Sequence, residues 1–197
     1  LETLEEHKMP KVYDSINRLQ ETPFRINAQV LDVMDYFWDK NFPVSGLPER
    51  EDLPIPPRPQ DIDENEEARK IWRRAAAAIH DENAASRAER ISIVKVLHLA
   101  KKFLEDDIYF TAQLDWRGRC YPTSYHLHPQ GPDYVKALLR FSRGTAIETD
   151  NAKKWLRIHG ANCWGLSKTT FDERVEWVED NREMIQRIAG DPLGNRD

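Results

Sequence analysis

Gln113-Leu114-Asp115-Trp116-Arg117-Gly118-Arg119-Cys120-Tyr121 is the most informative stretch of the chain. Two arginines flank a glycine, and a carboxylate stands just before them. Glycine permits a tight bend and a close approach of the backbone to a ligand, and guanidinium groups bind phosphate through paired hydrogen bonds. The pattern predicts a turn that holds nucleic acid. A structural salt bridge at a β-turn is the competing interpretation.

The residues around this turn predict short strands and then helices. Residues 108–114 are rich in β-branched and aromatic side chains, so we expect a strand, the turn and a second short strand. Residues 137–141 fit a strand or a helix, because periodicity cannot decide for so short a run. Helices are expected at about 150–163 and 171–189, the latter introduced by a capping box at Thr170 and Glu173.

The first hundred residues predict helices interrupted by a proline-rich segment. Residues 9–39 indicate two helices, the second opening at Thr22 and Pro23. Six prolines between Asn41 and Gln60 exclude regular helix there and favour an extended connection.

A helical hairpin is expected after the prolines. Its first helix begins near Asp63, and a break near 81–85 separates it from the second. Apolar residues at helical spacing in the second helix are expected to pack on those of the first. They are Ile93, Leu97, Ala100 and Leu104 in the second helix, and Trp72, Ala75, Ala76 and Ile79 in the first.

Composition limits the class of protein. The 197 residues carry a net charge of −5, which argues against a surface that coats nucleic acid everywhere and favours a local binding site. No apolar run reaches the 18 or so residues that a membrane span needs, and the acidic start is unlike a secretory signal. We therefore expect a cytosolic protein with reduced cysteines. His126 and His128 have a spacing that two metal ligands can use, but no cysteine or third histidine lies near them in the sequence, so no metal site is expected.

The turn is one of three motifs that together resemble a known family. The others are Pro129-Gln130-Gly131 and Trp155-Leu156-Arg157-Ile158-His159-Gly160-Ala161-Asn162-Cys163. In this order and spacing they resemble the single-subunit DNA-directed RNA polymerases of bacteriophages and mitochondria. The resemblance covers most of the chain.

The resemblance implies an α+β fold, predominantly α, that forms a fragment of a right-hand polymerase. The fragment would contain the end of the N-terminal helical region (1–45), a proline-rich connection (46–64), a thumb-like helical hairpin (65–106) and the first part of the palm with a small antiparallel sheet (107–197). The start at Leu1 and the end at residues 194–197 also suggest a piece of a longer polypeptide.

The family uses the turn for contacts with the template and the RNA–DNA hybrid. Arg119 is the first candidate for a template phosphate and Arg117 the second, because guanidinium stays charged at every physiological pH. Asp115 would fix the turn, and Gly118 would allow the backbone to approach the ligand. The remaining candidates are Tyr121 near the template, unless it is half-buried in a strand, Lys136 after the second motif, and Lys95, Lys101 and Lys102 of the thumb. His159 is interpreted as a core histidine.

The resemblance also implies what the chain lacks. Family members transfer nucleotides with Mg²⁺ held by aspartates of motifs downstream of anything matched here. The fragment alone is therefore expected to bind the DNA template and the RNA transcript without making RNA. The remaining palm and fingers would come from the same or a second chain, in the host cytoplasm if the protein is phage-encoded. The alternatives are a non-catalytic nucleic-acid-binding or regulatory protein derived from such a polymerase, and a purely helical scaffold.

Overall fold

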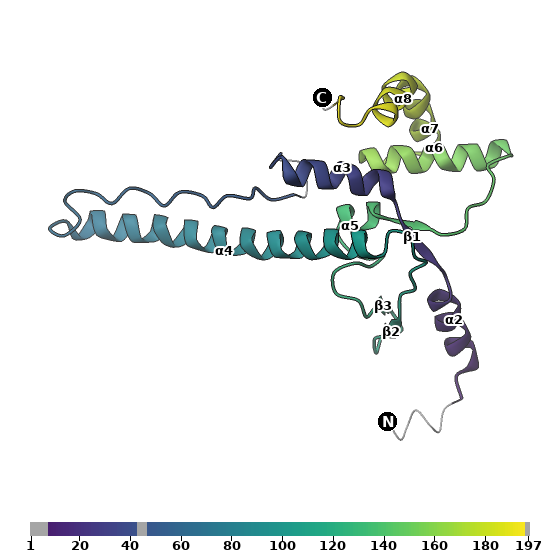
Figure 1. Cartoon of the computed structure of the whole chain (residues 1–197), viewed down its shortest axis with the longest axis horizontal. Helices are drawn as coiled ribbons and strands as arrows, with labels where there is room; N and C mark the ends of the chain where they lie inside the picture. The colour runs from purple at the N-terminus through teal and green to yellow at the C-terminus, as the bar shows by residue number, and fades with distance from the viewer. Residues whose placement is uncertain (1–7, 43–46, 196–197) are drawn as a thin grey trace. The chain divides into compact units, whose positions relative to one another are not determined.

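A computed structural model describes residues 8–42 and 47–195. The described chain is mostly helical and contains two small antiparallel sheets, as expected for a predominantly α member of the α+β class (Figure 1). It divides into two compact units, residues 1–143 and 144–197.

The first unit contains eight elements in the described residues. They are α2 (Pro10–Gln20), β1 (Phe24–Ile26), α3 (Ala28–Asp39), α4 (Glu66–Lys102), β2 (Ala112–Leu114), β3 (Cys120–Pro122), α5 (Asp133–Ala137) and β4 (Leu139–Phe141). Strand β1 pairs with β4 and strand β2 pairs with β3, both antiparallel. The undecided run 137–141 contains the end of α5 and then β4.

The predicted helix start at Thr22 and Pro23 is wrong. Residues 24–26 form β1, because they pair with residues 139–141 far along the chain. The Thr22 hydroxyl donates to the Arg18 carbonyl at the end of α2 at 3.0 Å. Helix α3 is capped instead by Asn27, whose Oδ1 accepts from the Val30 amide at 3.4 Å.

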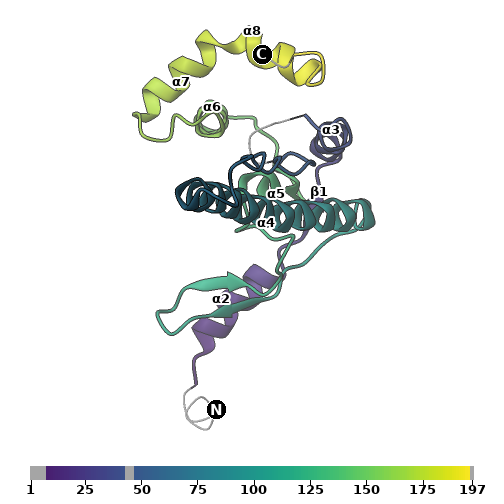
Figure 2. The same ribbon diagram turned by 90° about the vertical axis from the view of Figure 1, so that its left-hand side faces the viewer.

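The predicted hairpin of two helices is also wrong, since residues 66–102 form one continuous helix. No glycine or proline interrupts this segment, and Asn83, at the expected break, is buried with both amide atoms bonded to residue 53. The N-terminal cap is Asn65 rather than Asp63. Instead of a second helix, the strap, which we define as residues 47–63, runs back along α4 (Figures 1 and 2).

The hydrophobic core of the first unit lies around the C-terminal third of α4. Of the predicted stripe, Ile93, Leu97 and Ala100 are buried and Leu104 packs against the core while partly buried. Val96, which was not predicted, is buried with them, and the expected partners of the stripe were wrong. The partners come from β1, α3, the loop before α5, and the α5–β4 segment; they are Ile26, Leu31, Met34, Leu127, Val135 and Leu138.

The second unit consists of α6 (Asp150–Trp164), α7 (Phe171–Asp180) and α8 (Arg182–Gly190). The predicted capping box is confirmed: Thr170 Oγ1 accepts from the Glu173 amide, and the Glu173 side chain accepts from the Thr170 amide. The single helix expected over 171–189 is divided at Asn181. Its side-chain amide donates to the Trp177 carbonyl at 2.8 Å and ends α7 there.

Candidate nucleic-acid interface

The Asp115–Arg119 segment is the turn of the β2–β3 hairpin, as the sequence predicts. Gly118 has a φ of +75°, a conformation that favours glycine. Asp115 Oδ1 accepts from the amides of Arg117 and Arg119, each at 2.9 Å. The backbone closes the turn as well, since the Asp115 amide donates to the Arg119 carbonyl at 2.9 Å. The expected role of Asp115 in fixing the turn is confirmed.

The two arginines of the turn differ in how free their charge is. Arg117 donates to Asp115 Oδ2 from Nε at 2.9 Å and from Nη2 at 2.8 Å, and its Nη2 lies 3.5 Å from the Tyr121 hydroxyl. Arg119 is exposed, and its guanidinium has no hydrogen bond or ion pair with a described residue. Arg119 is therefore the turn arginine whose charge is available to an external anion.

The pKa of Asp115 reflects this arrangement. Partial burial acts to raise the pKa, but the amides of Arg119 and Arg117 and the Arg117 guanidinium together hold it below its usual value. The carboxylate thus stays charged, and it holds Arg117 while leaving Arg119 free.

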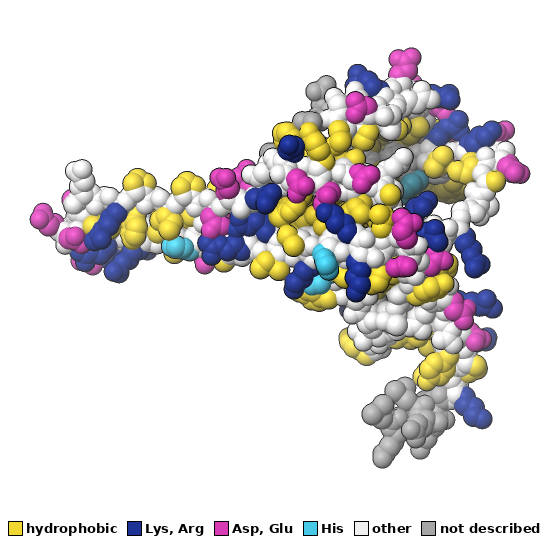
Figure 3. Space-filling model, viewed as in Figure 1, with side chains coloured by type: hydrophobic (Ala, Val, Ile, Leu, Met, Phe, Trp, Pro, Cys, Tyr) yellow, Lys and Arg dark blue, Asp and Glu magenta, His cyan; other side chains and the backbone are white. Residues whose placement is uncertain are grey.

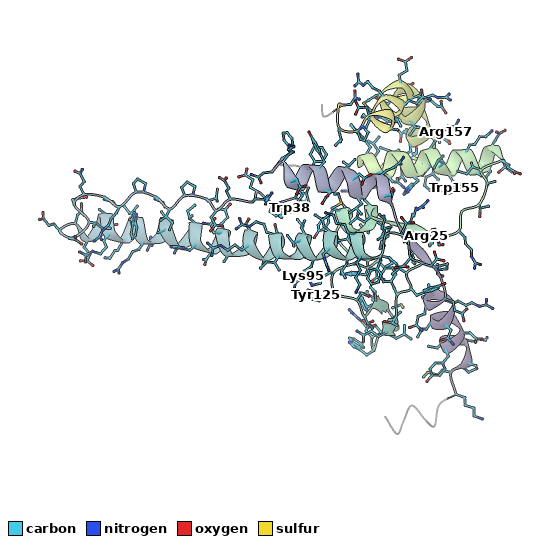
Figure 4. The ribbon with its side chains drawn as sticks, in the orientation of Figure 1. Arg25, Trp38, Lys95, Tyr125, Trp155 and Arg157 are labelled. Atoms are coloured by element: carbon cyan, nitrogen blue, oxygen red, sulfur yellow. The ribbon has the colours of Figure 1, made fainter. Side chains whose placement is uncertain are left out.

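Two exposed aromatic side chains of the hairpin region were missed by the sequence analysis. Trp116, in the turn, is 91% exposed with the Arg117 guanidinium 5.4 Å from its ring. Tyr125, in the loop after β3 at the end of the hairpin away from the turn, is 87% exposed (Figure 4). Tyr121 is 37% exposed, so it is neither a core residue nor fully free. Exposed rings next to a cation can stack on unpaired bases. The sequence could have indicated them, because both are aromatic residues that do not belong to any periodic apolar pattern.

The Pro129-Gln130-Gly131 motif ties the hairpin to the core. A Cβ added at Gly131 would lie 2.9 Å from Cβ and Cγ1 of the fully buried Val135, so this turn packs directly on α5. Gln130 Nε2 then donates to the Cys120 carbonyl in β3 at 3.0 Å. On the other strand, the Ala112 amide donates to Gln20 of α2 at 2.9 Å. Lys136 on α5 pairs with Asp133 at 2.7 Å and is half-exposed.

The three predicted lysines of α4 do not share one face. Lys101 points toward α3, where it forms an ion pair with Asp35 at 2.5 Å, so it has a structural partner. Lys95 is exposed on the side of α4 away from the strap (Figure 4). Lys102 is exposed as well and lies 5.2 Å from the Phe103 ring.

Lys95 and Lys102 belong to an exposed stripe that the sequence analysis missed. Its members recur every three or four residues along α4 and include no acidic residue; they are Arg73, Ala77, His80, Ala84, Arg87, Ile91, Lys95, His98 and Lys102. We call this set the basic stripe. The space-filling view shows basic side chains at several points along the α4 arm, with hydrophobic and acidic side chains between them (Figure 3). Arg87 forms an ion pair with Asp52 of the strap, whereas the other members of the stripe have no ion pair with a described residue.

The third motif lies in the second unit, on α6. Ile158 and Ala161 are its buried members. His159 is exposed with Nε2 3.6 Å from Cys163 Sγ, so its interpretation as a core histidine is wrong. Arg174 on α7 is buried and donates to the Asn162 side chain at 3.0 Å, which holds the end of α6 against the following loop.

No group of three potential metal ligands lies within the residues that the structure describes. Nδ1 of both His126 and His128 is buried without a hydrogen-bond partner, and burial lowers the pKa of His128. None of the helices in the described ranges is long and apolar enough to cross a membrane.

Comparison with known proteins gives consistent matches. Residues 148–197 match the family described as DNA-dependent RNA polymerase. The chain is 42% identical over 190 residues to the DNA-directed RNA polymerase of Enterobacteria phage K11 and 43% identical over 192 residues to T7 RNA polymerase of Escherichia phage T7, each match covering 95% of this chain. It is 32% identical over 189 residues to the mitochondrial DNA-directed RNA polymerase 1B of Nicotiana tabacum. These matches span 21%, 21% and 19% of the relatives, so the chain corresponds to about a fifth of their length.

Proposed function

Because this chain belongs to the family of phage-type DNA-directed RNA polymerases, we propose that it contributes template and hybrid binding to templated nucleotidyl transfer. The observation that carries the proposal is the β2–β3 turn, where one carboxylate holds Arg117 and leaves the neighbouring Arg119 free. The backbone of the fixed turn needs no further ordering when Arg119 binds, and a guanidinium forms paired hydrogen bonds with phosphate, which favours a phosphate ligand.

The arrangement supports distinct roles for the turn residues. Arg119 binds a phosphate of the template, and Arg117, whose charge is paired with Asp115, orients Trp116 and Tyr121. Gly118 keeps the turn free of a side chain where the template strand approaches. Lys95 and Lys102 on α4 neutralise further phosphates, and Lys136 contributes weakly because Asp133 shares its charge. Lys101 serves the fold.

The chain by itself does not catalyse nucleotide addition in this proposal. Asp115 is committed to the turn and Asp133 is paired with Lys136, so these carboxylates do not fit a Mg²⁺ site. The Mg²⁺ ligands then belong to polymerase segments outside these 197 residues, which lie further along the same polypeptide or in a second one. The assembled enzyme acts in the cytoplasm of the host. No nucleotide incorporation is expected from a preparation of this chain alone. Incorporation by such a preparation contradicts this part of the proposal.

The binding role is tested by replacing Arg119 with alanine. The affinity for a primed template is measured against salt, and the slope of log affinity on log salt should fall by about 0.7 to 0.9, as for one lost phosphate contact. Over a fourfold rise in salt concentration, the affinity of the unmodified chain should therefore fall roughly threefold more than the affinity of Arg119→Ala. Arg119→Lys should keep more of the slope than of the affinity, because it retains the charge without the paired hydrogen bonds.

Arg187→Ala is the matched control. Arg187 is exposed on α8 in the second unit, and its replacement changes the net charge by the same amount. Its salt slope should equal that of the unmodified chain. If Arg119→Ala and Arg187→Ala give the same slope, the turn does not bind phosphate and Arg119 has no binding role.

A further inference from the structure

The N-terminal part of α4 extends beyond the hydrophobic core with the strap along it. Among the described residues, the side chains of α4 that face the strap hold its backbone at successive points. Arg90 donates to the Arg50 carbonyl, Asn83 to the Leu53 carbonyl, Trp72 to the Pro56 carbonyl, and Arg69 to the carbonyls of Ile62 and Asp63. The order of these bonds shows that the strap runs antiparallel to the helix.

The strap has no slack between its middle attachments at Leu53 and Pro56. These three steps of chain span about 9 Å in a polyproline conformation at about 3.1 Å per residue. Their partners Asn83 and Trp72 are 11 helical steps apart, or about 17 Å at 1.5 Å per residue, and the two side chains reach across the difference. A chain that is already extended between these attachments cannot shift along the helix without breaking both of them.

Asn83 is bonded to the strap in both directions. Its Oδ1 accepts from the Leu53 amide at 2.8 Å and its Nδ2 donates to the Leu53 carbonyl at 3.0 Å. The side chain is only 5% exposed, so any shift of the strap would leave a buried amide without partners. One residue before Leu53, the Asp52 carboxylate accepts from both Arg87 and Arg90. These contacts fix the register of the strap.

We propose that Asn83 and Asp52 are positioning residues that hold the α4 arm in one orientation by fixing the strap against it. The strap occupies one side of the helix, and Lys95 lies on the other (Figure 4). The fixed arm therefore presents the basic stripe to a nucleic-acid duplex. This last step rests on the proposed function, whereas the fixing of the arm does not.

The first test measures the register and orientation in the full chain without nucleic acid. Asn83→Leu keeps the number and branching of the side-chain heavy atoms and removes both hydrogen bonds, so exchange of the Leu53 amide with deuterium should accelerate roughly ten- to hundredfold. Spin labels at positions 32 on α3 and 74 on α4, with Cys120 and Cys163 replaced by serine, should give one narrow distance distribution that broadens in Asn83→Leu. Both reporter positions are exposed.

Glu82→Leu is the matched control, because it places the same side chain at the adjacent, exposed position of α4. It should leave the exchange rate and the distance distribution unchanged. An Asn83→Leu chain whose Leu53 exchange and distance distribution match those of the control overturns the proposal. If Asn83→Leu fails to fold, Asp52→Asn replaces it in both measurements, since it removes only the ion pairs with Arg87 and Arg90.

The second test asks whether orientation matters for binding. The unmodified chain should bind a long RNA–DNA hybrid more tightly than a short one, because the long duplex reaches the basic stripe. Asn83→Leu and Asp52→Asn should lose this gain and keep the affinity for the short hybrid. If a variant has a broadened distance distribution and still binds the long hybrid more tightly than the short one, the positioning role is refuted. Absence of binding to either hybrid by the unmodified chain refutes the proposed function instead, and the exchange and distance measurements still decide whether the strap fixes the arm.

Discussion

Replacing Gly131 with alanine should destabilise the first unit, because the Pro129-Gln130-Gly131 turn has no room for a Cβ atom. The new atom would lie 2.9 Å from Cβ and Cγ1 of Val135 and 3.2 Å from the His128 carbonyl oxygen. Val135 is fully buried and cannot move without disturbing the core. Overpacking of this kind costs about 1–3 kcal/mol, and the lower entropy of the unfolded alanine chain offsets roughly 0.4–1 kcal/mol of it.

A net loss of about 1–2 kcal/mol in the free energy of unfolding lowers the melting temperature of a unit of this size by roughly 3–8 °C. Calorimetry of the full chain measures this shift. Gly144→Ala is the control, since a Cβ there has no neighbour within 4 Å, and its melting temperature should stay the same or rise slightly. Val135→Ala should cost less in the Gly131→Ala background than alone, because it removes the Cγ1 atom and with it part of the clash. Equal melting temperatures for the two glycine variants would refute the argument.

Three further predictions follow from individual contacts. Lys101→Ala should lower the free energy of unfolding by at most about 1 kcal/mol and leave the slope of log affinity on log salt unchanged. Lys95→Ala should reduce this slope and leave the free energy of unfolding unchanged. Thermal melting and salt titration of both variants measure the two quantities. Pairing with Arg87 and then Arg90 lowers the pKa of Asp52 from 3.8 to about 2, so its stabilising contribution is complete above about pH 4 and is lost as the pH falls toward 2. Asp52→Asn should remove that part of the acid dependence in denaturant titrations, and an unchanged pH profile would show that the pairs do not stabilise the fold. Thr170→Ala should cost the second unit about 1 kcal/mol through loss of the capping box, seen as faster amide exchange in α7 and not in α4.

The sequence was most informative where the structure is decided locally. The turn at Gly118 needs a positive φ, and its carboxylate bonds to amides two and four residues away, so both signals lie within five residues. The capping box at Thr170 is local in the same sense. The candidate phosphate ligand could be chosen from this pattern, but only the structure shows that Asp115 holds Arg117 and leaves Arg119 free.

The errors arose where a distant segment decides the local structure. Thr22 and Pro23 carry a good helix-start signal, yet the next residues pair with a strand more than a hundred residues away. Polar residues near 81–85 indicate a break between helices, but Asn83 finds its partner in the strap, 30 residues earlier. The basic stripe was overlooked because only Lys95 and Lys102 of its members were singled out, and the basic residues of this segment were not placed on a helical face.

The extended strap has a consequence for how this region can change in length during evolution. One residue of strap covers about twice the distance of one residue of helix, and both are joined at each end of the arm. Adding two turns to α4, roughly seven residues, keeps the same side facing the strap and requires about three or four more residues in the strap. Insertions and deletions in the two segments of related polymerases should therefore occur together, in a ratio of about two to one, and an unmatched change in either segment should be rare.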